Sequence, residues 1–136
     1  MPKTTYHGSC YCKSVRFTAD IDFDTTPTGR CNCTSCRKRR WWSAQIAPEA
    51  FHLEAGGDHC LKIETGGGSV LHLCPSCGVI VYSTIPKTDW NDGPRIAISV
   101  PALDDLAPET LLAAPATYYD GLHDNWWNPP EEVRHL

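Results

Sequence analysis

Three cysteines fall within six residues in the segment Cys31-Asn32-Cys33-Thr34-Ser35-Cys36. A Cys-x-Cys pair in extended backbone places both side chains on one face, because a strand repeats every two residues, and Cys-x-x-Cys turns a third sulfur back toward them. Three such sulfurs can hold one zinc ion. Zinc favours four tetrahedral ligands, so a site with three protein ligands keeps one position for water or substrate. The spacing therefore predicts a chemically active, open zinc site at Cys31, Cys33 and Cys36.

A second metal motif is the zinc knuckle Cys74-Pro75-Ser76-Cys77-Gly78. Cys-x-x-Cys wraps a tight turn around the metal, and the glycine permits left-handed backbone that directs amides toward sulfur. A knuckle supplies only two ligands, and another close cysteine pair stands earlier in the chain. We therefore expect a closed site of four cysteines: Cys10, Cys12, Cys74 and Cys77. The sites could instead exchange pairs, with Cys31 and Cys33 on the knuckle, because spacing alone does not fix connectivity.

The eighth cysteine, Cys60, stands outside any motif and follows His59. A lone cysteine that enters an apolar strand is usually a small buried hydrophobe, so we interpret Cys60 as a packing residue. The alternative is that Cys60 or a histidine completes the Cys31 site and closes it. Histidines that alternate with apolar residues usually pack or hydrogen-bond instead of binding metal. We interpret five histidines in this way: His7, His52, His59, His72 and His123.

The composition narrows the class of protein. A chain of 136 residues is expected to form one domain over residues 1–136, large enough for a hydrophobic core without disulfides. No apolar run has the length of a signal peptide or a membrane span, which predicts a cytoplasmic protein with no membrane partner. In that compartment, clustered cysteines favour metal thiolates over disulfides. The net charge of −4 makes nucleic acid an unlikely partner.

A basic and aromatic run, Arg37-Lys38-Arg39-Arg40-Trp41-Trp42, follows the first cysteine motif. Its simplest interpretation is a solvated turn whose positive charge offsets the metal thiolates. Its functional interpretation is an anion clamp in which Arg37 and Lys38 hold the carboxylates of a bound molecule, since guanidinium groups grip carboxylates in bidentate fashion. Trp41 and Trp42 are expected to pack in the core, and only one of them can line a groove if both lie in a strand.

The elements that must position these residues are mostly short strands. Residues 6–22 predict a hairpin that turns near Lys13-Ser14, because Val15, Phe17, Ala19 and Ile21 alternate with polar residues. Residues 22–29 are expected to form a loop, and a short helical turn capped by Thr34 or Ser35 follows it. Further strands are bounded by glycine and proline turns and are expected at 43–47, 51–54, 60–64, 69–73, 79–83 and 95–100. With one short helix inside 103–112, the pattern predicts a mainly β, antiparallel domain.

The tail, residues 117–136, contains two tyrosines, two tryptophans and two prolines. It is too aromatic to be disordered, so we expect it to fold over the sheet or the metal sites. Four segments then resemble the glutathione-dependent formaldehyde-activating enzyme family, which also includes centromere protein V. These segments are Gly8–Phe17, Cys31–Lys38, Cys74–Gly78 and Gly121–Trp126. The resemblance covers nearly the whole chain and includes counterparts of all seven cysteines assigned above.

The resemblance implies a β-tent fold of short antiparallel strands around a structural four-cysteine zinc. It also implies a second zinc, held by Cys31, Cys33 and Cys36, at which glutathione and formaldehyde form S-hydroxymethylglutathione. The expected activity is that of a carbon–sulfur lyase, with two zinc ions per chain and a small thiol and an aldehyde as partners. The alternative function is a non-catalytic, zinc-stabilised binding module for protein or nucleic acid. The run from Arg37 to Trp42 favours that alternative, and the acidic net charge opposes it.

Overall fold

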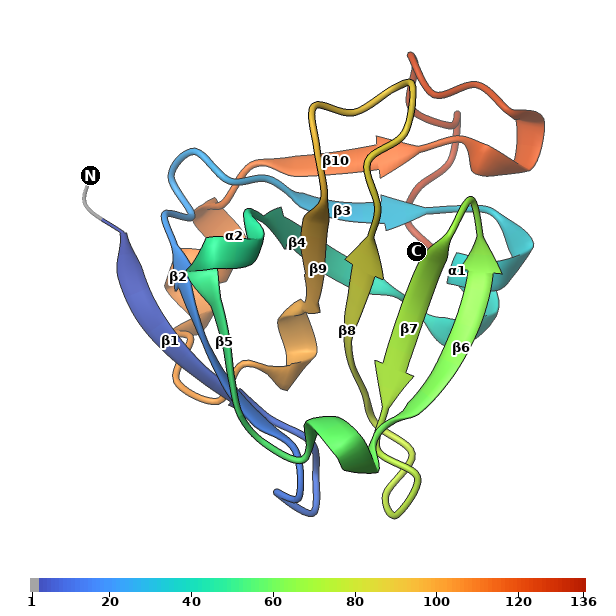
Figure 1. Cartoon of the computed structure of the whole chain (residues 1–136). Coiled ribbons are helices and arrows are strands. Elements are labelled where there is room, and N and C mark those ends of the chain that lie inside the picture. The colour runs from blue at the N-terminus through green and yellow to red at the C-terminus, as the bar shows by residue number, and fades with distance from the viewer. Residues whose placement is uncertain (1–2) are drawn as a thin grey trace.

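Ten strands, two short α-helices and four short 3-10 helices make up the secondary structure of residues 3–136, which the computed structural model describes (Figure 1). The strands are β1 (Thr4–Ser9), β2 (Arg16–Ile21), β3 (Thr28–Cys31), β4 (Trp42–Ile46), β5 (Phe51–Ala55), β6 (Leu61–Gly66), β7 (Ser69–Leu73), β8 (Ile80–Ile85), β9 (Arg95–Ser99) and β10 (Ala116–Tyr119). The helices are α1 (Thr34–Arg39) and α2 (Pro108–Ala113). The prediction of a mainly β fold with little helix is confirmed. No helix in this part of the chain is long and apolar enough to cross a membrane.

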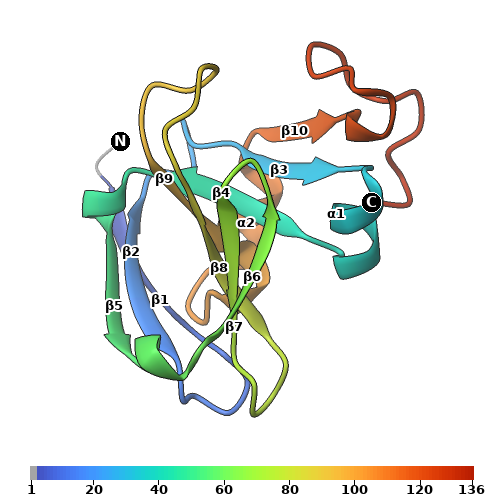
Figure 2. The same ribbon diagram turned by 45° about the vertical axis from the view of Figure 1, so that its right-hand side comes forward.

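The strands form two sheets. One has the order β1-β2-β5, and the other has the order β10-β3-β4-β9-β8-β7-β6. The turns that follow β1 and β7 lie at the same end of the molecule, at the bottom of Figure 1. Turning the molecule shows β10, β3 and α1 on the side away from the β1-β2-β5 sheet (Figure 2). The cysteine motifs thus lie in two places: at the shared end of the two sheets and beside α1.

The β1–β2 hairpin forms where the apolar alternation predicts it. Phe17, Ala19 and Ile21 of β2 are almost fully buried, whereas Thr18 and Asp20 between them are partly exposed. The ring of Phe17 packs against Phe51, whose ring lies 4.7 Å from that of Tyr82 in the other sheet. A Cβ atom at Gly8 would lie 2.2 Å from the Phe17 ring, so only glycine fits at that position. Aromatic packing therefore holds the two sheets together.

One expectation for the chain path was wrong, because the loop expected over 22–29 ends earlier. Thr28–Cys31 forms β3, and the tail contributes β10, which pairs with β3 in parallel. Both strands have only four residues, and their pairing joins segments far apart in sequence, so neither leaves a local pattern. The short helix expected inside 103–112 forms as α2, which begins at Pro108, a residue suited to the first helical position because it lacks an amide hydrogen.

An exposed contact ties β1 to the loop before α2. The Nδ1 atom of His7 lies 2.8 Å from Oδ2 of Asp105, and the backbone amide of His7 donates to Oδ1 at 2.9 Å. The hydrogen bond to Asp105 raises the pKa of His7 above its ordinary value. A raised pKa in the folded state means that the protonated pair stabilises the fold fully below the unfolded pKa near 6.5, and that this contribution is lost as the pH rises through the folded pKa.

We therefore expect Asp105→Asn to lower the melting temperature at pH 5.5 and to have a smaller effect at pH 8.5. Thermal unfolding followed by circular dichroism at both pH values measures the difference. Asp92→Asn, in the β8–β9 loop, removes the same charge elsewhere and serves as the control. An Asp105→Asn effect that did not shrink with rising pH would show that the ion pair contributes nothing to stability.

Candidate metal centre

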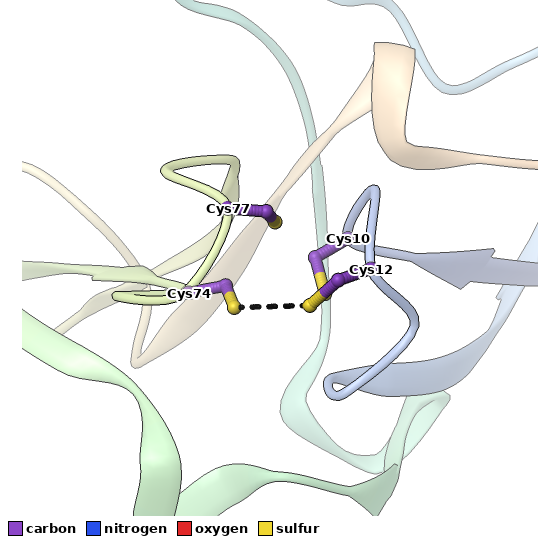
Figure 3. A group of neighbouring side chains, drawn as sticks. All are labelled: Cys10, Cys12, Cys74 and Cys77. Carbon is purple, nitrogen blue, oxygen red and sulfur yellow. Dashed lines mark hydrogen bonds between the residues drawn. The ribbon is translucent and has the colours of Figure 1, made fainter.

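Four cysteine side chains meet where the turns after β1 and β7 face each other (Figure 3). Cys10 and Cys12 come from the first turn, and Cys74 and Cys77 from the second. The Sγ atom of Cys12 lies 3.7 Å from that of Cys10 and 3.6 Å from that of Cys74, and all four sulfurs lie within 4.8 Å of one another. Sulfurs bound tetrahedrally to zinc at about 2.3 Å lie about 3.8 Å apart. The cluster could therefore hold one zinc ion.

Local backbone explains how each turn presents its sulfurs. The amide of Val15 donates to Cys10 Sγ at 3.3 Å, while Lys13 takes left-handed backbone with a φ of 65°. In the knuckle, the Gly78 amide donates to the Cys74 carbonyl at 2.7 Å, and Gly78 has a φ of 81°. Glycine adopts that conformation without steric cost, so the tight turn predicted around Cys74 forms.

The thiols of this cluster differ in acidity. The Ser14 hydroxyl, 3.1 Å from Cys12 Sγ, lowers the pKa of Cys12 to about 6. Burial raises the pKa of Cys74 to about 11, because ionisation in a site without water is unfavourable. A bound dication would reverse this penalty by supplying the compensating charge. The cluster thus has one readily ionised thiol at its exposed edge and a buried thiol that needs a metal.

A second cluster contains Cys31, Cys33 and Cys36, whose sulfurs also lie within 4.8 Å of one another. Cys31 ends β3, Cys33 caps α1, and Cys36 lies in its first turn. The expected caps, Thr34 and Ser35, lie inside the helix instead. The Cys33 sulfur accepts from the Cys36 amide at 3.4 Å, so the side chain that caps the helix belongs to the cluster itself. The structure groups the seven cysteines as four and three, and does not join Cys31 and Cys33 to the knuckle.

The three thiols cannot all ionise readily without a cation. Burial raises the pKa of Cys36 and that of Cys31. Burial also opposes ionisation of Cys33, but hydrogen bonds from the Cys36 amide and side chain lower its pKa overall. One thiolate therefore forms first and repels charge on its neighbours. The set of donors suits a soft divalent metal, which thiolates bind well.

The tail packs against this cluster through a buried polar contact that the sequence did not reveal. The Asn32 side chain donates to Asp120 Oδ1 at 2.8 Å and accepts from the Leu122 amide at 3.0 Å. This hydrogen bond from Asn32 lowers the pKa of Asp120, which also lies 2.8 Å from His123 Nδ1. A Cβ atom at Gly121 would lie 2.7 Å from Cys31 Sγ, so the tail backbone approaches the sulfur closely.

A cavity of about 220 Å³ opens beside Cys31 and Cys36. Its lining residues include arginines from β3 and α1 and the last residues of the tail: Arg30, Arg37, Arg40, Trp41, Trp42, Pro101, His135 and Leu136. The Arg30 guanidinium lies 3.9 Å from the centre of the Trp42 ring, a cation–π contact that holds it at the cavity wall. Arg40 Nη1 donates to the His135 carbonyl at 3.3 Å, which anchors the tail here.

The structure places the basic run as follows. Trp42 packs against the hydrophobic core as expected, and both Trp41 and Trp42 line this cavity, because Trp41 precedes β4 and follows Arg40 in left-handed backbone, so strand alternation does not apply. Lys38, expected to bind carboxylates with Arg37, is exposed on α1 and is not among the residues that line the cavity. Arg30 was missed as a site residue. Its position immediately before Cys31 was the available signal.

The remaining cysteine and several histidines make other contacts. Cys60 packs against the hydrophobic core, and its thiol donates to the Gly56 carbonyl at 3.5 Å. His59 Nε2 lies 3.0 Å from the Ser76 hydroxyl, and His52 lies 3.7 Å from an Asp20 oxygen. His72 is buried and stacks on Tyr82 at 4.2 Å. These side chains lie outside the two cysteine clusters found in residues 3–136.

Comparison with known proteins decides the family. A family model described as glutathione-dependent formaldehyde-activating enzyme matches residues 5–120. The chain belongs to this family. The fold is similar to that in a crystal structure of a Rhodobacter sphaeroides protein, with a TM-score of 0.64. The two proteins share 19% sequence identity, and the match covers 82% of this chain and 98% of that chain. A search of curated proteins gave no match.

The two clusters are expected to respond differently to substitution. The four-cysteine cluster joins turns about sixty residues apart, so metal binding there contributes directly to folding. Cys74→Ser should therefore abolish the folded state. The three-cysteine cluster is local, so Cys33→Ser should leave a folded protein with one zinc ion instead of two. Elemental analysis combined with circular dichroism measures both properties.

Cys60→Ser is the matched control, since it replaces a cysteine outside both clusters. It should keep two zinc ions per chain and the native circular dichroism spectrum. Equal loss of structure in Cys74→Ser and Cys33→Ser would contradict this division of roles between the clusters.

Proposed function

We propose that residues 1–136 form one zinc domain that joins a small thiol to an aldehyde, or splits their adduct, at Cys31, Cys33 and Cys36. The observation that supports this most is the count of donors. Three sulfurs converge, and no fourth cysteine, histidine or carboxylate from the described residues joins them. A zinc ion held there would have one position free for a substrate, whereas the four-cysteine site would be closed.

The proposed reaction is the addition of a thiol to an aldehyde, and it needs no oxidant or reductant. The thiol sulfur attacks the aldehyde carbon, a carbon–sulfur bond forms, the carbonyl becomes a hydroxyl, and the thiol proton ends on that oxygen. Zinc would supply a Lewis acid that keeps the thiol substrate deprotonated at neutral pH. Amide donors to Cys31 and Cys33 hold two of the sulfurs in place. Because three thiolates already donate strongly to the metal, a thiolate added there would stay nucleophilic.

The proposed thiol is an anionic one of the glutathione type. Arg30, Arg37 and Arg40 line the cavity that Cys31 and Cys36 also line, so a sulfur near the cysteines has cationic groups within the same space. Glutathione carries two carboxylates, and guanidinium groups bind carboxylates through paired hydrogen bonds. The formaldehyde-activating activity named in the family description agrees with this substrate class. The cavity therefore supports a thiol anchored by its carboxylates beside the cysteines.

We expect glutathione to bind the zinc-loaded protein and S-methylglutathione to bind much more weakly, because a thioether cannot donate to zinc as a thiolate does. Binding of glutathione should strengthen as the pH rises and its thiol deprotonates. Arg37→Gln should weaken binding of glutathione by about 10- to 100-fold, the value of one or two charge-assisted hydrogen bonds. Isothermal titration calorimetry measures each affinity.

Lys38→Gln is the control, because it removes the same charge from the next residue, which does not line the cavity. It should change the affinity little. Equal binding of the two ligands would show that the metal is not the anchor. If neither bound, and the second zinc proved to have four protein ligands, the catalytic proposal would fail and the non-catalytic binding module would replace it.

A further inference from the structure

A second cavity, of about 200 Å³, borders the three-cysteine cluster and shares Trp41 with the arginine-lined cavity. Cys36 and Trp41 line both this cavity and the arginine-lined one, and Cys33 lines only the second of the two. A molecule bound at the cysteines can therefore extend in either direction. The arginine-lined cavity is the proposed binding site of the thiol. The second cavity has no assigned ligand in the proposed function.

The floor of this cavity is the outer face of the seven-stranded sheet. The strand registers pair Gln45 with Ala97, Ala97 with Ser83, and Ser83 with Leu71, so these four side chains share one face across β4, β9, β8 and β7. Ala97 and Ser83 are small and nearly buried, while Gln45 is exposed. Because Ala97 and Ser83 are small, they leave space for the cavity above the sheet, and the side-chain amide of Gln45 borders that cavity.

The walls combine apolar side chains, Trp41, Leu71 and Ile85, with neutral polar groups and one charged group. Hydroxyl groups come from several strands, at Ser43, Thr65, Ser69 and Ser83. Arg39 is the one charged side chain among the described residues that line the cavity, and it donates to the Ser35 hydroxyl. Neutral hydroxyl and amide groups recognise hydroxyl groups by exchanging hydrogen bonds with them. The lining is suited to a neutral, hydroxylated ligand.

The cavity has room for an aldehyde larger than formaldehyde. Formaldehyde has two non-hydrogen atoms and is scarcely larger than water, whose share of liquid volume is about 30 Å³. A space of about 200 Å³ beside Cys33 and Cys36 holds several more atoms. A one-carbon aldehyde would leave most of the serine-lined surface without a partner.

We propose that this cavity holds the substituent of the aldehyde, and that the preferred aldehyde is a neutral hydroxyaldehyde of two or three carbons. The inference rests on the proposed function and names the second substrate class of the same site. Glycolaldehyde would react as R–SH + HOCH₂–CHO → R–S–CH(OH)–CH₂OH, with the thiol proton transferred to the carbonyl oxygen. Its hydroxymethyl group would lie against Ser43, Gln45 and Ser83, with the thiol in the arginine-lined cavity.

A matched pair of thioethers tests the cavity without turnover. S-(2,3-dihydroxypropyl)glutathione and S-propylglutathione differ only in two hydroxyls and share the same inability to donate as thiolates. Calorimetry with the zinc-loaded protein should show the dihydroxypropyl compound binding about 3- to 10-fold more tightly, the value of about one net neutral hydrogen bond. Exchange NMR should likewise show faster enzyme-dependent adduct formation with glycolaldehyde than with propionaldehyde or formaldehyde, after subtraction of the uncatalysed rate.

Variants assign the preference to this surface. The double variant Ser83→Ala, Gln45→Leu should abolish the preference for the dihydroxypropyl compound, whereas Thr84→Val, on the opposite face of β8, should keep it. Equal or tighter binding of the propyl compound, adduct formation no faster with glycolaldehyde than with propionaldehyde, or a preference that survives the double variant would overturn the inference. If glutathione itself still bound and formaldehyde still reacted, the proposed function would stand. If glutathione did not bind, both would fall.

Discussion

Mutual repulsion among closely spaced thiolates is the constraint on which this structure depends. Seven cysteines lie in two clusters whose sulfurs are less than 5 Å apart, and burial raises the pKa of Cys31, Cys36 and Cys74. Such clusters are stable as thiolates only with a compensating cation. The tight turns at Lys13 and Gly78 and the amide donors to sulfur are arranged to favour that state. Folding and metal binding are therefore expected to be coupled.

Both clusters consist of closely spaced cysteines, but they occupy different positions in the fold. The four-cysteine cluster links the turn after β1, in one sheet, to the turn after β7, in the other, and thus fixes the end of the fold where the sheets meet. The three-cysteine cluster is formed by one segment, and it is covered by the tail rather than by a fourth ligand. Asn32, between two of the cysteines, bonds to Asp120 and to the Leu122 amide, so the segment and its cover are positioned together.

The sequence predicted the features that depend on local pattern. Alternating apolar residues placed the β1–β2 hairpin, and cysteine spacing indicated which sulfurs could converge. The parallel pairing of β10 with β3 was missed because it joins segments almost ninety residues apart and has no signature in either strand. The same is true of Asp120 beside Asn32. The cap of α1 was misassigned because Cys33, rather than a hydroxyl residue, accepts the amide. The strand expected from Ser43 begins one residue earlier, at Trp42, and the left-handed Arg40 leaves Trp41 between α1 and β4.

X-ray absorption at the zinc edge tests the central claim most directly, because it reports the sulfur count around the metal. With two zinc ions per chain, one closed and one open, the average coordination without thiol should be about 3.5 sulfurs and 0.5 lighter atoms. Saturating glutathione should raise the average to about 4 sulfurs, and S-methylglutathione should not. An average of 4 sulfurs before any thiol is added, or a value that glutathione leaves unchanged, would contradict the account.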